Sequence, residues 1–219
     1  MTRKPFSLTC VTYQPGDHIG EACAILALAP IFIIVSYATL LISRREAHLV
    51  FILAGQLLNL VLNAVLKAII NQPRPAGSDH PGPGMPSDHS QFMAYWACYG
   101  VLFLLVHVKR VGRSGWRPAL AAGMLALAAA VAASRVYLGY HTLEQVLAGL
   151  VVGSAVAVVW FVLYASIVRP RIGGWVNHPA CRYFMVRDCS HLEDIVAFEY
   201  EAVHFSRKAG KAARTPKVD

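Results

Sequence analysis

The sequence predicts an all-α integral membrane protein, a helical bundle of about five transmembrane spans. Hydrophobic residues occupy 56% of the 219 positions and charged residues only 15%, whereas a typical soluble domain is about 25% charged. The charged residues also cluster, and they leave five uncharged windows, at Ala22 to Ser43, Ala47 to Leu66, Ser90 to Val108, Pro118 to Ser134 and Gln145 to Val168. Most of these windows reach the ~20 residues that a helix needs to cross the ~30 Å hydrocarbon core of a bilayer.

The spans use about half the chain, so we expect one membrane-embedded domain over residues 1–219 and no second domain. Residues 1–20 form a polar segment interrupted by Pro5 and Pro15, which is not typical of a signal peptide. We therefore expect the first span to be an uncleaved anchor. The transmembrane core is expected at 21–174 and a tail at 175–219.

The net charge of +8 is distributed in a way that indicates membrane topology rather than nucleic-acid binding. Basic residues follow the first, third and fifth windows, at Arg44, Arg45, Lys109, Arg110, Arg113, Arg117, Arg169 and Arg171. These loops alternate, so they share one side, and the positive-inside rule makes that side cytoplasmic. The segment 1–20 and the loops 67–89 and 135–142 are then lumenal or external. We expect membrane lipids as partners and no nucleic acid, and the sequence leaves protein partners open.

Three basic residues, Lys67, Arg74 and Arg135, fall on the lumenal side against this bias. A bound anion explains them better than topology does, and contact with lipid headgroups is the alternative. Lys67 ends a row of polar residues on one face of the second span, at Gln56, Asn59, Asn63 and Lys67. The three amides are equally well explained as hydrogen-bonding partners of a neighbouring helix. In the fifth span, Gly149 and Gly153 favour close helix packing.

The tail mixes aromatic and charged residues without a window long enough to span. We interpret it as a cytoplasmic interfacial segment with a solvated basic end. The cysteines, at Cys10, Cys23, Cys98, Cys181 and Cys189, have no metal-ligand spacing and are interpreted as structural thiols. Six histidines are expected at the surface or the membrane interface, namely His18, His48, His107, His178, His191 and His204.

Three stretches on the lumenal side carry the residues suited to chemistry. They are Lys67 with Arg74 and Pro75, the run Pro86-Ser87-Asp88-His89, and Ser134-Arg135 with His141 six residues later. Lys67, Arg74 and Arg135 together provide three permanent positive charges, and arginine matches phosphate oxygens in a bidentate manner. Ser87 and the backbone N–H groups at the start of the third span add further anion donors.

The two histidines in these stretches, His89 and His141, complete a site for phosphoryl transfer. One imidazole can attack phosphorus and the other can exchange a proton with the leaving oxygen, since histidine titrates near neutral pH. The residues alone do not say which histidine has which role.

The series K-x6-R-P, P-S-x-H and S-R-x5-H resembles the signature of the type 2 phosphatidic acid phosphatase superfamily. Within it, the runs 84–93 and 134–142 look like those of dolichyldiphosphatases, as do the tail pieces 183–188 and 198–200. The resemblance covers nearly the whole chain. It implies removal of the terminal phosphate from a dolichyl, or more generally polyprenyl, diphosphate at the lumenal face of the endoplasmic reticulum. That reaction recycles the lipid carrier of N-glycosylation, in a membrane-embedded site that needs no metal or other cofactor.

Carried onto this sequence, the resemblance makes His141 the nucleophile that forms a phosphohistidine, and His89 the acid and then the base. Lys67, Arg74, Ser87, Asp88 and Arg135 surround the transferred phosphate in this assignment.

Two residues depart from the common superfamily pattern. Asp88 stands where many members have glycine, and we hypothesise that its carboxylate pairs with a nearby Lys or Arg. Gln145 stands where many members have an aspartate that orients the nucleophile. An amide oxygen also accepts the imidazole proton but raises the basicity of the ring less.

Three other interpretations stay open. A metal-dependent hydrolase would use Asp79, His80, Asp88, His89 and His141 as ligands, although their spacing matches no zinc site. A non-catalytic polyprenyl lipid carrier would need the cations but not the histidines. A broad-specificity phosphatidate or undecaprenyl diphosphate phosphatase would share the same pocket.

Overall fold

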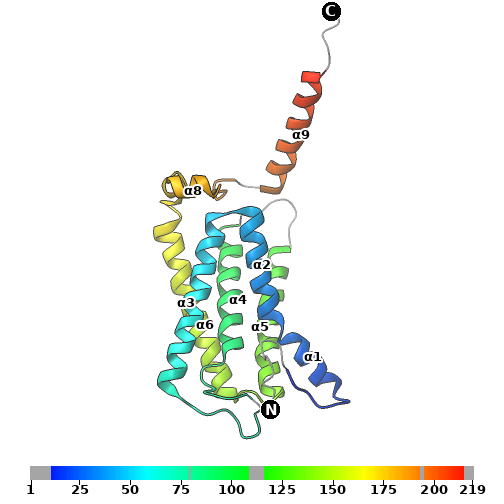
Figure 1. Cartoon of the computed structure of the whole chain (residues 1–219), viewed down its shortest axis with the longest axis vertical. Helices are drawn as coiled ribbons and strands as arrows, with labels where there is room; N and C mark the ends of the chain where they lie inside the picture. Colours follow the sequence, from blue (N-terminus) through cyan, green and yellow to red (C-terminus); the bar gives the residue numbers. More distant parts are fainter. Residues whose placement is uncertain (1–10, 79, 109–115, 193–194, 215–219) are drawn as a thin grey trace, which may run out of the picture.

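The computed structural model describes residues 11–78, 80–108, 116–192 and 195–214, and within them it is a bundle of helices (Figure 1). Five helical segments of the described chain are long and apolar enough to cross a membrane, at His18–Arg44, Ala47–Ile70, Asp88–Val106, Trp116–Tyr137 and Leu143–Val168. They coincide with the five uncharged windows. The predicted all-α membrane fold is therefore confirmed.

The first span is two helices, α1 (His18–Leu26) and α2 (Ala29–Arg44). Pro30 lies in the first turn of α2 and has no N–H to donate to the carbonyl four residues earlier. The N–H of Ile31 instead bonds to the carbonyl of Leu28 at 2.9 Å. The helix is therefore interrupted at Ala27 and Leu28, and α1 packs against α5 (Trp116–Tyr137).

The centre of the bundle is α4 (Asp88–Val106), which packs most extensively on α6 (Leu143–Leu163) and also on α5 and α3 (Ala47–Ile70). A π-helical turn, η1 (Tyr164–Val168), continues α6. A side chain at Gly153 would meet the carbonyl oxygen of Gln91 at 2.2 Å, and one at Gly149 would meet that of Ser87 at 2.7 Å. These glycines let α4 and α6 approach closely, as their small size predicts.

The polar row on α3 faces α4. Asn63 donates to Oε1 of Gln91 at 2.7 Å, and Gln91 donates back to Oδ1 of Asn59 at 2.9 Å. Both asparagines are buried, so the interhelical interpretation is confirmed for them. The amide of Gln56 is buried with no hydrogen-bond partner in the described part of the chain.

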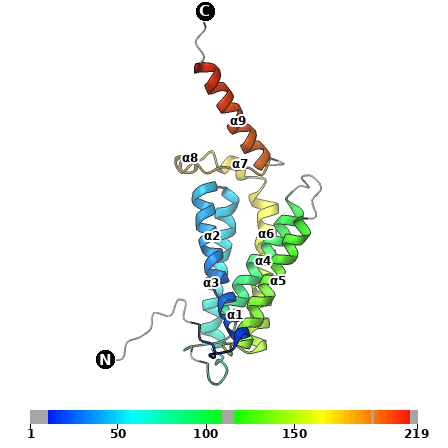
Figure 2. The ribbon, with the colours of Figure 1, turned by 90° about the vertical axis from the view of Figure 1, so that its right-hand side faces the viewer.

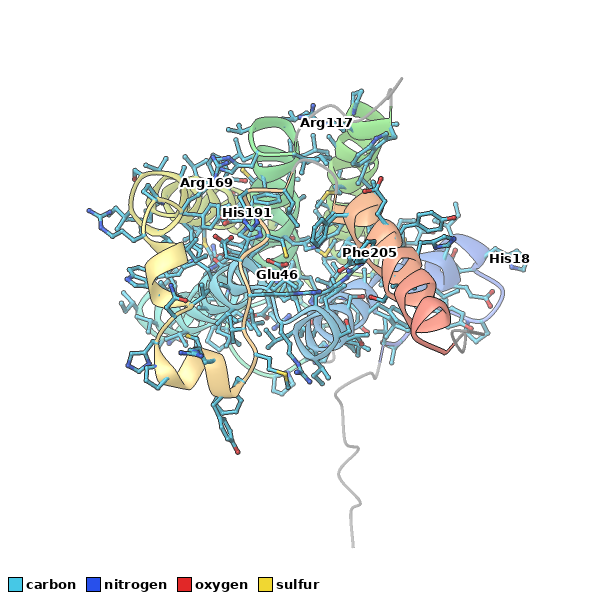
Figure 3. The ribbon with its side chains drawn as sticks, turned by 90° about the horizontal axis from the view of Figure 1, so that it is seen from above. His18, Glu46, Arg117, Arg169, His191 and Phe205 are labelled. Carbon is cyan, nitrogen blue, oxygen red and sulfur yellow. The ribbon has the colours of Figure 1, made fainter. Side chains whose placement is uncertain are left out.

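The bundle has two ends, and we call the one at which α3 ends and α4 begins the site end. Figure 2 shows α7 (Ile172–Trp175) and α8 (Pro179–Tyr183) lying across the other end, which we call the tail end, and α9 (Ile195–Arg214) projecting from it. Figure 3 looks down on the tail end, with Arg117 and Arg169 labelled around it. The end of α2, with Arg44 and Arg45, lies there as well. The alternate basic loops therefore share one end, and Lys109, Arg110 and Arg113 lie outside the described residues.

The tail is fastened to the bundle at this end. Arg44 forms an ion pair with Glu199, and Arg187 donates from its backbone to the carbonyl of Arg45 at 3.0 Å. His48, expected at the surface or the membrane interface, is partly buried near the start of α3, and its ring stacks on Phe103 at 3.9 Å. A histidine whose ring packs on aromatic neighbours loses little by burial when it stays neutral.

Candidate active site

The three predicted stretches meet at the site end. Lys67 lies in the last turn of α3 and Arg74 in the loop that follows, while Arg135 lies in the last turn of α5. Asp88 and His89 begin α4 directly after Ser87, and His141 and Gln145 flank the start of α6. Helix ends from four parts of the chain thus bring all eight residues together.

His141 is held in one orientation. Its Nδ1 lies 2.9 Å from the carbonyl oxygen of Gly84 and 3.2 Å from Oε1 of Gln145. Both oxygens accept hydrogen bonds, so Nδ1 carries the proton and Nε2 keeps a free electron pair. Nε2 lies 3.2 Å from Nη1 of Arg74, which donates to it. The imidazole therefore presents its basic nitrogen to the cationic side of the site.

The imidazole is also kept neutral. Burial, followed by the charges of Arg74 and Arg135, lowers the pKa of His141 from its ordinary 6.5 to about 3. A buried cation next to two guanidinium groups is unfavourable on both grounds. At neutral pH the ring is an unprotonated base, which is the form that a nucleophile requires.

Arg74 and Arg135 each have at least one guanidinium N–H group that donates to no atom of the described residues. Arg135 is 3% exposed. Its Nε and Nη1 are buried and have no hydrogen-bond partner among the described residues, as is true of Nε of Arg74. Unsatisfied buried donors are unfavourable, and an anion with several acceptor oxygens satisfies them. Burial, partly offset by Asp88, also lowers the pKa of Arg74, which stays protonated at neutral pH.

Lys67 and Asp88 form an ion pair, so the carboxylate that departs from the superfamily pattern does have a basic partner. The side chain of Asp88 is 46% exposed and that of Lys67 only 15%. Asp88 also interacts electrostatically with Arg74, Arg135 and His141. The carboxylate thus partly balances the three cations.

His89 points towards the interruption in the first span. Its Nε2 lies 3.1 Å from the carbonyl oxygen of Ala27, which only accepts, so Nε2 carries the proton. Ile31 bonds to Leu28 rather than to Ala27, which leaves this carbonyl for the histidine. Nδ1 of His89 is therefore the nitrogen without a proton.

Gln145 forms hydrogen bonds to several segments that make up the site. Its Nε2 donates to Oε1 of Gln72 at 3.1 Å and to the carbonyl of Pro73 at 2.8 Å. Its backbone carbonyl accepts from the N–H of Ser87 at 3.0 Å. Gly84 leaves room for this side chain, because a Cβ there would lie 2.5 Å from its Oε1. The amide thus anchors the loop before Arg74 as well as His141.

Sequence reasoning missed Gly84, Ala27 and Tyr140. Gly139 adopts a left-handed φ of 71° and turns the chain after α5, so that the N–H groups of Tyr140 and His141 both bond to the carbonyl of Arg135. The guanidinium carbon of Arg135 then lies over the ring of Tyr140, 4.3 Å from the ring centre. The one sequence feature that pointed to Tyr140 was its place directly before His141.

The alternative metal site receives no support from the described residues, in which no three His, Cys, Asp or Glu side chains are grouped to hold an ion. Asp79, one of its proposed ligands, lies outside the described residues.

Comparison with known proteins identifies the family of the chain. Residues 47–169 match the family model of the PAP2 superfamily. The chain is 39% identical to "Dolichyldiphosphatase 1" of Homo sapiens over 94% of this chain and 93% of that one. It is 38% identical to "Dolichyldiphosphatase 1" of Dictyostelium discoideum over 90% and 87%, and 34% identical to "Lipid phosphate phosphatase gamma" of Arabidopsis thaliana over 97% and 96%.

Among solved structures, the fold is similar to a transmembrane PAP2-type phosphatidylglycerolphosphate phosphatase from Bacillus subtilis. The TM-score is 0.60 at 22% identity, over 74% of this chain and 83% of that one. The family match covers more than half of the chain, and the relatives match nearly all of it. The chain therefore belongs to the PAP2 superfamily, within its dolichyldiphosphatase family.

Proposed function

We propose that this protein hydrolyses dolichyl diphosphate to dolichyl phosphate and inorganic phosphate, through a phosphohistidine on His141. The observation that supports the chemistry is the free Nε2 of His141 beside Arg74, at a site with unsatisfied guanidinium donors. The similarity to dolichyldiphosphatases over nearly the whole chain supports the substrate.

In the first step, Nε2 of His141 attacks the terminal phosphorus and the bond from phosphorus to the bridging oxygen breaks. Dolichyl phosphate leaves with that electron pair. Lys67, Arg74, Ser87 and Arg135 hold the transferred phosphoryl oxygens and stabilise their charge. No metal ion is needed for this purpose, because three fixed cations already surround the phosphate.

In the second step, water attacks the phosphohistidine and the P–N bond breaks, which restores neutral His141. His89 accepts the proton of the water at Nδ1, the nitrogen that is free when Nε2 donates to Ala27. The orientation of His89 suits this basic role. The leaving dolichyl phosphate of the first step needs little help from an acid, because the second pKa of a phosphate monoester is about 6.

The test is phosphate release by the purified full-length protein in detergent with EDTA present. Dolichyl diphosphate, dolichyl phosphate and phosphatidic acid are compared, with His141→Ala and the exposed control His204→Ala. We expect selective cleavage of the diphosphate, lost in His141→Ala and kept in His204→Ala. Inactivation by EDTA would contradict the metal-free mechanism, and turnover that does not depend on His141 would contradict the nucleophile.

A broad lipid phosphatase is the second candidate, and the relative named "Lipid phosphate phosphatase gamma" favours it. Similar rates on all three substrates would establish this alternative. The absence of turnover on all of them would favour a non-catalytic lipid carrier. Trapping of the protein with substrate radiolabelled at the terminal phosphate separates either phosphatase from the carrier, because only an enzyme with a phosphohistidine retains label that survives alkali and is lost in acid.

We also propose that the protein lies in the endoplasmic reticulum membrane with its site end in the lumen, where it recycles the carrier of N-glycosylation. The basic tail end supports the orientation. Pro81→Cys at the site end and Asn177→Cys at the tail end test it, in a background without the native cysteines. In sealed microsomes, an impermeant maleimide should label only Asn177→Cys, and labelling of Pro81→Cys alone would reverse the orientation.

A further inference from the structure

Tyr140 contacts both phosphate-site arginines and occupies one of the unspecified positions of the S-R-x5-H series. It is 3% exposed. Its carbonyl oxygen accepts from Nη1 of Arg74 at 3.1 Å, and its ring lies 4.3 Å from the guanidinium carbon of Arg135. One residue therefore contacts both guanidinium groups, and it does so through two different parts of its structure.

The ring contact matters because little else fixes Arg135. Nε and Nη1 of its guanidinium have no hydrogen-bond partner in the described part of the chain. A cation over the face of an aromatic ring is attracted by the ring quadrupole. With the guanidinium resting on the ring, the direction of its free N–H groups follows the tilt of the Tyr140 ring.

That tilt is set from a distant part of the sequence. The hydroxyl oxygen of Tyr140 accepts from the backbone N–H of Thr12 at 2.7 Å and lies 2.9 Å from the Thr12 hydroxyl. The partners are 128 residues apart. The segment before α1 thus holds the far end of the ring on which Arg135 rests.

We propose that Tyr140 is a positioning residue, whose ring directs the Arg135 guanidinium at the bound phosphate while Thr12 holds that ring in place. Tyr140 itself touches no reacting atom. The inference rests on the proposed phosphatase chemistry of this site, but not on which lipid is cleaved.

The test uses orthovanadate, which mimics the phosphate and needs no lipid. Its affinity for the full chain in detergent is measured by thermal shift for Tyr140→Leu, which removes the aromatic ring, and Tyr140→Phe, which removes only the hydroxyl. Tyr137→Leu is the matched control. The Tyr137 hydroxyl donates to Asp17 of the same N-terminal segment at 3.1 Å, but this tyrosine is 51% exposed and rests under no arginine.

We expect Tyr140→Leu to weaken vanadate about tenfold, in line with a desolvated cation–π contact. The expected loss for Tyr140→Phe is about threefold, that of one modest hydrogen bond, and Tyr137→Leu should bind as the parent does. Equal losses in Tyr140→Leu and Tyr140→Phe would overturn the role of the ring. A loss in Tyr137→Leu as large as in Tyr140→Leu would instead assign the effect to the N-terminal segment and also overturn the proposal.

A double-mutant cycle with Arg135→Lys separates positioning from packing. If Tyr140 acts through Arg135, the losses of the two single variants do not add, whereas additive losses would overturn the proposal. Tyr140→Met, which fills much of the ring volume without an aromatic face, replaces Tyr140→Leu if the latter does not fold. Vanadate binding that follows this pattern in a protein inactive on dolichyl diphosphate would refute the proposed substrate and leave the role of Tyr140 standing.

Discussion

Nη1 of Arg74 donates to Nε2 of His141 at 3.2 Å and to the carbonyl oxygen of Tyr140 at 3.1 Å. The guanidinium thus lies against the one imidazole nitrogen that is free to attack. In the proposed mechanism, a phosphate that enters the site contacts Arg74 and the nucleophile together, and Arg74 transfers its hydrogen bond from the imidazole to the phosphoryl oxygens as the N–P bond forms.

Arg74→Lys tests this arrangement. Lysine keeps the charge but loses the planar set of donors, so we expect kcat/KM on the diphosphate to fall about a hundredfold. The matched control is Arg182→Lys on the exposed surface of α8, which should be unchanged. Full activity in Arg74→Lys would show that charge alone is sufficient at this position.

Asp88→Asn should tighten anion binding. The carboxylate pairs with Lys67 and offsets part of the positive charge, so its neutralisation frees the lysine for phosphate. We expect inhibition by inorganic phosphate to strengthen about threefold, a modest value because the carboxylate is half exposed. Asp188→Asn, at the tail end, is the control. An inhibition constant that stays the same in Asp88→Asn would show that the ion pair does not compete with the ligand.

Gly84→Ala should damage the site through Gln145. The new Cβ would lie 2.5 Å from Oε1 of Gln145, which must move and release Nδ1 of His141. We expect kcat to fall at least tenfold, with a loss similar to that of Gln145→Ala. Gly123→Ala on α5 is the matched control, because a Cβ at Gly123 meets no atom within 4 Å. Activity that is retained in Gly84→Ala would mean that the Gly84 carbonyl alone orients the imidazole.

The stability of the protein should fall as the pH drops from 6.5 towards 3. The folded state keeps His141 neutral down to about 3, whereas the unfolded chain binds the proton near 6.5. The unfolded state therefore holds more protons between these values, and acid favours unfolding. The measurement is thermal unfolding of the parent and of His141→Gln from about pH 8 to about pH 4. The parent should lose more stability over this range, and parallel curves would refute the neutral imidazole.

His89→Ala should retain a larger fraction of parental activity on dolichyl diphosphate than on dolichyl phosphate. The diphosphate expels a phosphate monoester, which needs no proton, while the monophosphate expels an alkoxide that His89 can protonate only after Nδ1 has itself bound a proton. Rates of phosphate release on the two substrates provide the measurement. Equal proportional losses would assign His89 the same importance in both reactions.

The five spans were predictable because the length of an uncharged window is a local property of the chain. The interruption of the first span was visible in Pro30 but was not predicted, since hydropathy treats 18–44 as one segment. The stacking of His48 on Phe103 was not predicted, because a histidine at the edge of an apolar window has no signature that separates a packed ring from an interfacial one.

Motif spacing predicted which residues lie together at the site end, but it did not predict most of their contacts. The partners of His141 and His89 are the carbonyl oxygens of Gly84 and Ala27, and a backbone oxygen carries no mark of residue type. The contact between Thr12 and Tyr140 joins residues that no sequence pattern relates. Only the folded chain brings these atoms together.

The interruption between α1 and α2 has a consequence for how this protein tolerates change. A continuous helix satisfies its own carbonyls, but the broken one leaves the oxygen of Ala27, a residue only 3% exposed, dependent on His89. Replacing Pro30 with a good helix former should make the first span one continuous, more stable helix, and it should also withdraw the carbonyl that keeps the proton of His89 on Nε2.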